Sequence, residues 1–209
     1  MKTSIPLIIT ISRQLGSGGA AVGQQLAEKL NIRCVNREIV SRAAKKLSVM
    51  EQELDERDEK MQSFWKSFFQ FNALATEVAF PPGTRITTTG EVFRVESEIL
   101  QHVAKEESAV IIGRCGYAIL KDYPNLITVY LHADKAFRVD RIAHDGTMTT
   151  EEASEVIEKN DKERGLYIET FTGNKWSDAR HFDLCIDTGK IGIDKAVEII
   201  LNYVKLRCS

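Results

Sequence analysis

A glycine-rich stretch, Ser12-Arg13-Gln14-Leu15-Gly16-Ser17-Gly18-Gly19, separates a strand pattern from a helical pattern near the N-terminus. The preceding residues 7–11 read LIITI, and this β-branched content suits a strand that is buried on both faces. Apolar residues then recur three or four positions apart and predict a helix that begins near Ala20; they are Val22, Leu26, Ala27 and Leu30. A loop between such elements can present backbone N–H groups and the positive end of the helix to one anion, so we predict a phosphate site.

The loop differs from the usual P-loop, which reads G-x-x-x-x-G-K-[ST] and uses its lysine on the β- and γ-phosphates and its hydroxyl on Mg²⁺. In that register Arg13 takes the first glycine position, Gly19 the lysine position and Ala20 the hydroxyl position. We expect Arg13 to compensate for the missing cation, because its planar guanidinium can bind two phosphate oxygens at once. The alternative for Arg13 is an ion pair with a neighbouring carboxylate.

The same stretch also fits a dinucleotide fingerprint, through Gly16-x-Gly18-x-x-Ala21. In that fingerprint the first glycine follows the strand almost directly, whereas residues 12–15 intervene here. The acidic residue expected about 20 positions later could only be Glu38, which lies inside the next helical pattern. A phosphate loop is therefore favoured, and a dinucleotide site or a glycine turn without a ligand are the alternatives.

Length and composition set broad limits. The 209 residues suffice for one α/β core with a smaller insertion. A net charge of −2 offers no electrostatic argument for nucleic acid or an anionic membrane, and the longest apolar stretch, residues 5–11, is too short to cross a bilayer. Four widely spaced cysteines and four histidines show no metal-ligand spacing, so we predict no side-chain metal site and a reduced, cytoplasmic setting.

Strand-like runs alternate with helical patterns along the chain, which predicts an α/β protein with a mainly parallel five-stranded sheet. The runs lie at residues 7–11, 33–35, 109–112, 127–131 and 184–186. Because right-handed crossovers bring the carboxyl ends of parallel strands to one edge, we expect the following loops to meet there. These loops are the glycine stretch, Gly113-Arg114-Cys115-Gly116 and residues 134–141.

A long insertion separates the second and third strands, at residues 36–108. It is too long for a loop, so we expect a lobe of its own within a single domain of residues 1–209. It contains an acidic helix pattern, interpreted as a solvated face, and another helix at roughly residues 90–106. Its aromatic cluster at residues 64–71 favours a lobe core or dimer contact over a platform for base stacking.

Three pieces together resemble the cytidylate kinase-like family of P-loop phosphotransferases. They are the glycine stretch, the Gly113-Arg114 pair after the third strand, and Asp161-x-x-Arg164-x-x-Tyr167. The first looks like a branch of that family whose loop reads S-R-x-x-G-S-G-G and also lacks the lysine. The resemblance extends from about residue 7 to residue 201 and is specific as a set rather than through any single piece.

The resemblance implies a P-loop three-layer α/β/α fold with a helical monophosphate-binding insertion, residues 36–108, and a lid region, residues 134–170. It implies transfer of the γ-phosphoryl group of ATP to CMP or dCMP, with Mg²⁺. The partners would then be small-molecule nucleotides, without nucleic acid or membrane, and the protein a monomer or homodimer.

Candidate site residues follow from the strand ends, helical spacing and this resemblance. The ATP phosphates are assigned to Ser12, Gly16, Ser17, Gly18 and Gly19. The catalytic cations are assigned to Arg13, Arg138, Arg141 and Arg164. The acceptor is assigned to Arg37, Arg94, Arg114, Asp161 and Tyr167. A structural ion pair is the alternative for Arg114, and an ordinary solvated helix face is the alternative for Asp161, Arg164 and Tyr167.

Two other functions fit the same residues. The insertion leaves room for a P-loop kinase that phosphorylates a different small molecule. The absent lysine and hydroxyl, at Gly19 and Ala20, also fit a nucleotide-binding module that has lost catalysis.

Overall fold

The computed structural model describes residues 5–36, 40, 89–144 and 148–208. Its elements are β1 (Ile8–Arg13), α1 (Gly19–Leu30), β2 (Arg33–Val35), α4 (Thr89–Glu106), β3 (Ala109–Ile112), α5 (Gly116–Ile119), β4 (Leu126–His132), α6 (Lys135–Ala143), α7 (Thr150–Thr172), η1 (Ala179–His181), β5 (Leu184–Asp187), α8 (Thr188–Ile191) and α9 (Ile193–Cys208). The chain forms two compact units, and the larger one comprises Met1–Arg37 with Leu100–Ser209. Everything below concerns this larger unit unless stated.

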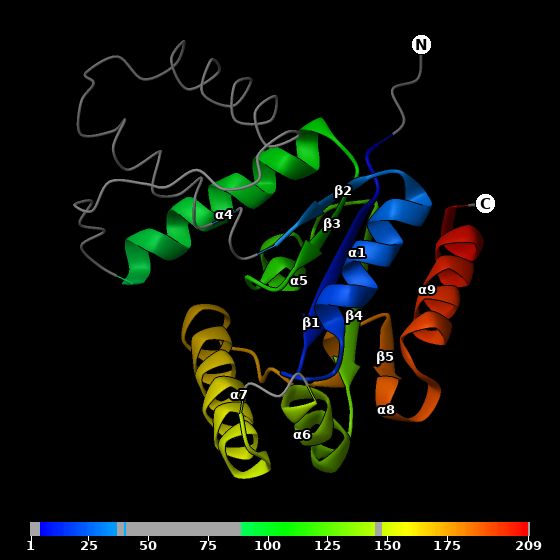
Figure 1. The fold of residues 1–209 in the computed structure, drawn as a ribbon. Helices are drawn as coiled ribbons and strands as arrows, with labels where there is room; N and C mark the ends of the chain where they lie inside the picture. Colours follow the sequence, from blue (N-terminus) through cyan, green and yellow to red (C-terminus); the bar gives the residue numbers. More distant parts are fainter. Residues whose placement is uncertain (1–4, 37–39, 41–88, 145–147, 209) are drawn as a thin grey trace, which may run out of the picture. The chain divides into compact units, whose positions relative to one another are not determined.

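The sheet has five strands in the order β2-β3-β1-β4-β5, and every pairing is parallel (Figure 1). The central strand β1 pairs Ile11 with Ile112 of β3 and Arg13 with Leu131 of β4. Parallel pairing in this order requires crossovers, and the intervening helices supply them. The predicted parallel α/β sheet is therefore confirmed.

Helices cover both faces of the sheet (Figure 1). Side chains of β1 alternate between faces, and Ile9 and Ile11 point into a core formed with α1 and α9. On the opposite face α5 approaches closely, since a Cβ added at Gly116 would lie 3.1 Å from Thr10. The result is the predicted three-layer α/β/α arrangement, with the central strands β1, β3 and β4 buried on both sides as their β-branched content suggests.

The strand and helix boundaries lie within one or two residues of the sequence predictions. Helix α1 begins at Gly19 rather than Ala20, and α4 begins at Thr89 rather than residue 90. The acidic and aromatic segments predicted for the insertion lie outside the described residues. The smaller compact unit, Glu38–Ile99, overlaps that insertion, and the division into lobe and lid stays a prediction.

Leu26 tests the α1 side of the core, because it is fully buried there. Leu26→Ala should lower the free energy of unfolding by about 2–5 kcal/mol, since it removes buried methyl groups and leaves a cavity. Urea denaturation followed by circular dichroism measures this loss. Gln24→Ala, at an exposed position two residues earlier, is the control, and an equal loss in both variants would contradict the assignment of α1 to the core.

Candidate functional site: an arginine-lined cavity beside the glycine loop

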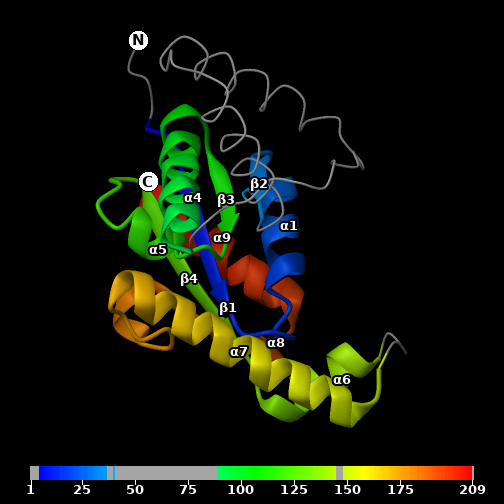
Figure 2. The ribbon, with the colours of Figure 1, turned by 90° about the vertical axis from the view of Figure 1, so that its left-hand side faces the viewer.

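The carboxyl ends of β1, β3 and β4 meet at one edge of the sheet (Figure 2). The register of the strands aligns these ends, because Ile11 lies opposite both Ile112 of β3 and Val129 of β4. Backbone bonds then hold the loops that follow: Gln14 N–H donates to Leu131 O at 3.0 Å and Gly113 N–H donates to Ile11 O at 2.9 Å. The predicted convergence of the glycine loop and the Gly113-Arg114 turn is confirmed.

The glycine loop leads into an uncapped helix terminus. Gly16 and Gly18 have φ values of +84° and +79°, which glycine adopts without steric cost. Gly18 is the N-cap of α1, and no side chain caps it. The first N–H groups of a helix have no partner within the helix, and the first turn of α1 carries no acidic residue. Such a terminus suits an anion, as the sequence predicts.

Two buried hydroxyl groups fix the glycine loop through hydrogen bonds to backbone carbonyl groups on its protein side. Ser17 is 1% exposed, and its hydroxyl donates to Gln14 O at 2.8 Å and to Leu131 O at 3.3 Å. The hydroxyl of Thr188, at the start of α8, donates to Ser17 O at 2.8 Å. The Ser17 side chain thus points into the protein, so only its backbone is available to a phosphate on the solvent side of the loop.

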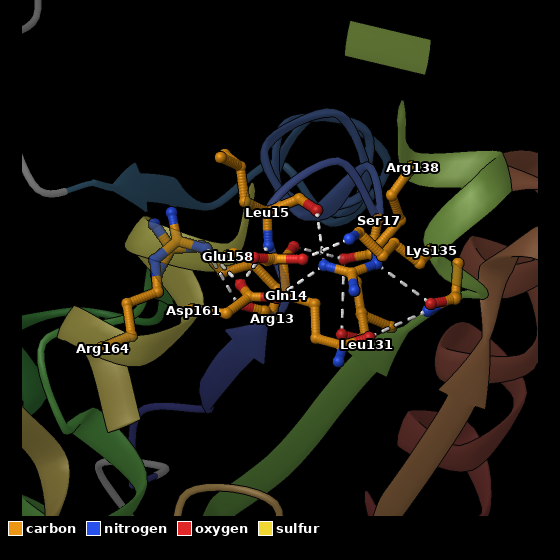
Figure 3. A network of polar contacts seen from close by, with 11 residues as sticks. Arg13, Gln14, Leu15, Ser17, Leu131, Lys135, Arg138, Glu158, Asp161 and Arg164 are labelled. Atoms are coloured by element: carbon orange, nitrogen blue, oxygen red, sulfur yellow. Dashed lines mark hydrogen bonds and ion pairs between the residues drawn. The ribbon is translucent and has the colours of Figure 1, made fainter. Parts of the chain in front are cut away.

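An ion pair joins the loop to the predicted lid helices α6 and α7 (Figure 3). Asp161 of α7 accepts the N–H of Leu15 at 2.9 Å and pairs with Arg138 of α6 at 2.5 Å. Arg138 also donates to Leu15 O at 3.2 Å and to Ala133 O at 3.0 Å. Arg138 and Asp161 were predicted to contact the transferred phosphoryl group and the acceptor. In the structure they bond each other and backbone groups of Leu15 and Ala133, and Asp161 also lies 4.0 Å from Nη1 of Arg164.

Arg141 lies three residues after Arg138 and reaches the other end of the loop. Its side chain is exposed, and its guanidinium carbon is 3.6 Å from where a Cβ on Gly18 would stand. A guanidinium beside the N-cap of α1 adds positive charge where the helix already favours an anion. The placement agrees with a role on the ATP phosphates, which stays a prediction.

A cavity of about 220 Å³ opens beside the loop, between the ends of β1 and β3 and one face of α7. Three guanidinium groups line it, those of Arg13, Arg114 and Arg164. Arg164 donates to Arg13 O at 3.2 Å, and the guanidinium carbon of Arg114 is 6.0 Å from the centre of the Tyr167 ring. The cavity thus brings together five of the predicted site residues, which are Ser12, Arg13, Arg114, Arg164 and Tyr167.

The turn after β3 has an unusual backbone. Gly113, Arg114 and Cys115 have φ values of +79°, +54° and +53° in succession. For a residue with a Cβ this left-handed conformation costs roughly 1–2 kcal/mol. Buried neighbours maintain it: Cys115 is 2% exposed, and Gly116 N–H donates to Gly113 O at 3.1 Å. Such conformations concentrate at functional sites, and this one aims Arg114 at the cavity.

Several cavity residues escaped sequence reasoning. Asn160 and Glu163 line the cavity together with Arg164 and Tyr167, at spacings of three and four along α7. This spacing defines one helix face and could have identified both residues. Thr188 offered no such signal, because its contact with the loop spans 171 positions.

Two predicted acceptor residues are not in the described part of the larger unit. Arg37 is outside the described residues. Arg94 is exposed on α4, in the smaller compact unit, and pairs with Glu98 at 2.6 Å. Both assignments stay predictions.

Tyr130 lies near the ion pair and carries a perturbed phenol. Burial, with a smaller contribution from the charge of Asp161, raises the pKa of Tyr130 to about 12. Its ring meets Trp176 edge-on with centroids 6.0 Å apart. At neutral pH the phenol is therefore protonated, and it acts as part of an aromatic wall rather than as a base.

Comparison with known proteins shows to which family the chain belongs. The sequence profile of the cytidylate kinase-like family matches residues 8–190. The chain belongs to this family. A protein from Saccharolobus islandicus named cytidylate kinase is 27% identical over 112 residues, which cover 54% of this chain and 59% of that protein, so the chain spans less than two thirds of it. A cytidylate kinase from Pyrobaculum islandicum is 25% identical over 95% of this chain and 92% of its own length.

A solved structure is also similar. The crystal structure of an uncharacterized protein from Eubacterium ventriosum superposes with a TM-score of 0.71 at 26% identity, and covers 95% of this chain and 98% of that one. Within the described residues, no group of three or more potential metal ligands occurs, and no helix has the length and apolarity needed to cross a membrane. The cytoplasmic location and the oligomeric state stay predictions.

Asp161→Asn tests whether the ion pair supports the loop. The change should cost about 3–5 kcal/mol of unfolding free energy, because it leaves the buried Arg138 charge without its carboxylate. The matched control is Glu158→Gln, which breaks the exposed pair between Lys135 and Glu158 of the same two helices. That change should cost less than about 1 kcal/mol, because the pair is exposed to solvent. Similar losses for both variants, measured by urea denaturation, would contradict the loop-supporting role.

Tyr130→Phe tests the perturbed phenol. Because the folded state raises the pKa of Tyr130 from 10.0 to about 12, the folded protein resists its ionisation. The free energy of unfolding should therefore be unaffected at neutral pH and fall as the pH rises from 10.0 toward 12. The Phe variant should show a shallower fall in this window, as measured by urea denaturation at stepped pH. Identical pH profiles for both proteins would contradict the assigned pKa.

Proposed function

We propose that the protein transfers the γ-phosphoryl group of ATP to a nucleoside monophosphate, with CMP or dCMP as the favoured acceptor. One observation carries this proposal: the glycine loop, which leads into the uncapped N-terminus of α1, lies beside a cavity lined by arginines. The loop and helix terminus suit the phosphate chain of a donor, and the cavity suits an anionic acceptor. Family membership supports both assignments.

On the donor side, backbone groups and one exposed arginine supply the binding. The N–H groups at the start of α1, together with the positive end of its dipole, suit the β-phosphate of ATP. Arg141, beside Gly18, neutralises further phosphate charge. The ion pair of Arg138 with Asp161 holds the loop in shape through the backbone of Leu15. We therefore assign Arg138 and Asp161 to positioning of the loop rather than to contact with the reacting groups.

On the acceptor side, charge favours a phosphate ester. The cavity lining includes three guanidinium groups and one carboxylate, that of Glu163, so its net charge is positive and suits a phosphate dianion. A guanidinium group can bind two oxygens of one phosphate through two parallel hydrogen bonds. Tyr167, Ile168 and Trp176 add apolar surface for the remainder of the acceptor. The names of the relatives from Saccharolobus islandicus and Pyrobaculum islandicum favour cytidine as its nucleoside.

Magnesium is expected to arrive with ATP. The Ser17 hydroxyl donates to two backbone carbonyls and Ala20 has no hydroxyl, so neither residue offers the ligand of the usual P-loop. Mg²⁺ commonly keeps several waters and binds substrate phosphates, and this mode fits a loop without a hydroxyl ligand. When bound, the ion neutralises phosphate charge.

Phosphoryl transfer requires mainly positioning and positive charge from the protein. An oxygen of the acceptor phosphate attacks the γ-phosphorus of ATP, the bond to the β–γ bridging oxygen breaks, and ADP leaves. Arg13 and Arg164 lie at the junction of loop and cavity, where this transfer would occur. A nucleotide-binding module without catalysis is the second candidate function, and it is favoured by the missing lysine at Gly19.

Coupled assays of ADP release with CMP, dCMP, UMP and AMP test the proposed reaction, with CMP or dCMP expected to give the highest kcat/KM. Arg114→Ala should raise the KM for the acceptor about 10- to 100-fold, because it removes a charged hydrogen-bond donor, while the KM for ATP changes little. Arg207→Ala, at an exposed position near the end of α9, is the control. ATP binding without turnover of any acceptor would favour the binding module instead.

A further inference from the structure

The side chain of Arg13 runs along two glycines that lie on different elements. A Cβ added at Gly19, the first residue of α1, would lie 2.6 Å from Cγ and 2.8 Å from Cβ of Arg13. A Cβ added at Gly113, after β3, would overlap Nη1 of the Arg13 guanidinium, with the guanidinium carbon 3.1 Å away. The stem of Arg13 therefore lies against the helix terminus, and its charged end lies against the turn that opens the cavity.

Position 13 and position 19 exchange roles relative to the usual phosphate loop. In that loop the first position is a glycine and the later position carries the lysine. Here the first position carries the cation, and the later position is the glycine. The distances show that the two changes depend on each other: a side chain at residue 19 and the present path of Arg13 require the same space.

We propose that Arg13 is the catalytic cation that replaces the lysine of the usual loop, and that residue 19 is glycine because Arg13 fills its side-chain space. This proposal rests on the proposed phosphoryl transfer. Arg13 contacts the γ-phosphate oxygens while the bond to the β–γ bridging oxygen breaks and the bond to the acceptor oxygen forms. It exchanges no proton or electron with the substrates, and lowers the barrier through charge alone.

The backbone of Arg13 is held firmly, which fixes the reach of its side chain. Arg13 pairs with Leu131 in the β1–β4 ladder, and its carbonyl accepts a hydrogen bond from Arg164 at 3.2 Å. The added Cβ at Gly19 meets Arg13 at Cβ and Cγ, the part of the side chain nearest this fixed backbone. Rotation of the far end cannot relieve that overlap. A larger residue at position 19 must therefore displace the arginine or shift α1.

Arg13→Gly should lower kcat about 10- to 100-fold, because it removes a charged hydrogen-bond donor from the transition state. Gly19→Ala should lower kcat as well, by displacing Arg13. In the Arg13→Gly background, however, Gly19→Ala should have no further effect, because the Cβ and Cγ atoms of residue 13 that the new methyl group would meet are then absent. This non-additivity is the signature of a shared space, whereas two independent defects would multiply. Thermal melting of all three variants separates loss of function from loss of fold.

A second test returns the positive charge from position 13 to position 19. Gly19→Lys alone should lower kcat, since the lysine and Arg13 compete for the same space. Combined with Arg13→Gly, the same lysine regenerates the usual arrangement, and kcat should exceed that of both single variants. A double variant no better than Arg13→Gly would overturn the exchange of positions 13 and 19.

Calorimetry supplies a readout that does not depend on turnover. Because the charged end of Arg13 lies beyond the helix terminus toward the cavity, Arg13→Ala should weaken binding of ATP more than binding of ADP. Equal effects on both nucleotides, or an unchanged kcat, would overturn the role of Arg13 while leaving the proposed function intact if wild-type protein phosphorylates CMP. Failure of the wild-type protein to phosphorylate any acceptor would overturn the proposed function itself, and this role of Arg13 with it.

Discussion

The carboxylate of Asp161 connects parts of the chain that are far apart in the sequence, and the geometry of the site depends on it. One oxygen accepts the N–H of Leu15 in the glycine loop, and the other pairs with Arg138 of α6. Arg138 also donates to Leu15 O, so both polar groups of one loop residue are bound by α6 and α7 (Figure 3). Such a buried pair is costly to break, because the partner left behind keeps an uncompensated charge. The loop is therefore held in shape by the protein itself, which is the condition for effective electrostatic stabilisation of the phosphate that we propose binds there.

The glycines of the site have a second role beyond backbone flexibility. Gly16 faces Arg138, whose Cβ would be 2.9 Å from an added methyl group, and Gly18 lies beside the guanidinium of Arg141. Gly19 and Gly113 both lie against Arg13. Gly16, Gly19 and Gly113 thus give room to an arginine, whereas Gly18 gives room mainly to Ile193, so three of the four glycines and the arginines beside them constrain each other. A loop without lysine is consistent with this packing, because its positive charge comes from neighbouring elements.

Much of the fold could be predicted because it depends on local signals. Short strand-like runs alternating with helical patterns predicted all five strands of the described sheet, and parallel topology then brought the glycine loop and Arg114 to one edge. The roles of Arg138 and Asp161 could not be predicted. Helical spacing places Arg138 and Arg141 on one face, but only the packing of α7 decides that the first is buried while the second stays exposed. The left-handed conformations of Arg114 and Cys115 likewise depend on tertiary contacts, since only the neighbouring glycines signal a turn.

The turn after β3 indicates how the fold maintains an unfavourable local state at the site. Two consecutive non-glycine residues in the left-handed region cost energy that a different turn would avoid. Burial of Cys115 and Tyr117 stabilises the turn, because relaxing the backbone would move these side chains out of the core. The outcome is an Arg114 aimed into a cavity that already holds the guanidinium groups of Arg13 and Arg164. The cavity lining carries these three guanidinium groups and one carboxylate, that of Glu163, so positive charge outnumbers negative charge along it. This balance of charge supports the anionic acceptor that we propose.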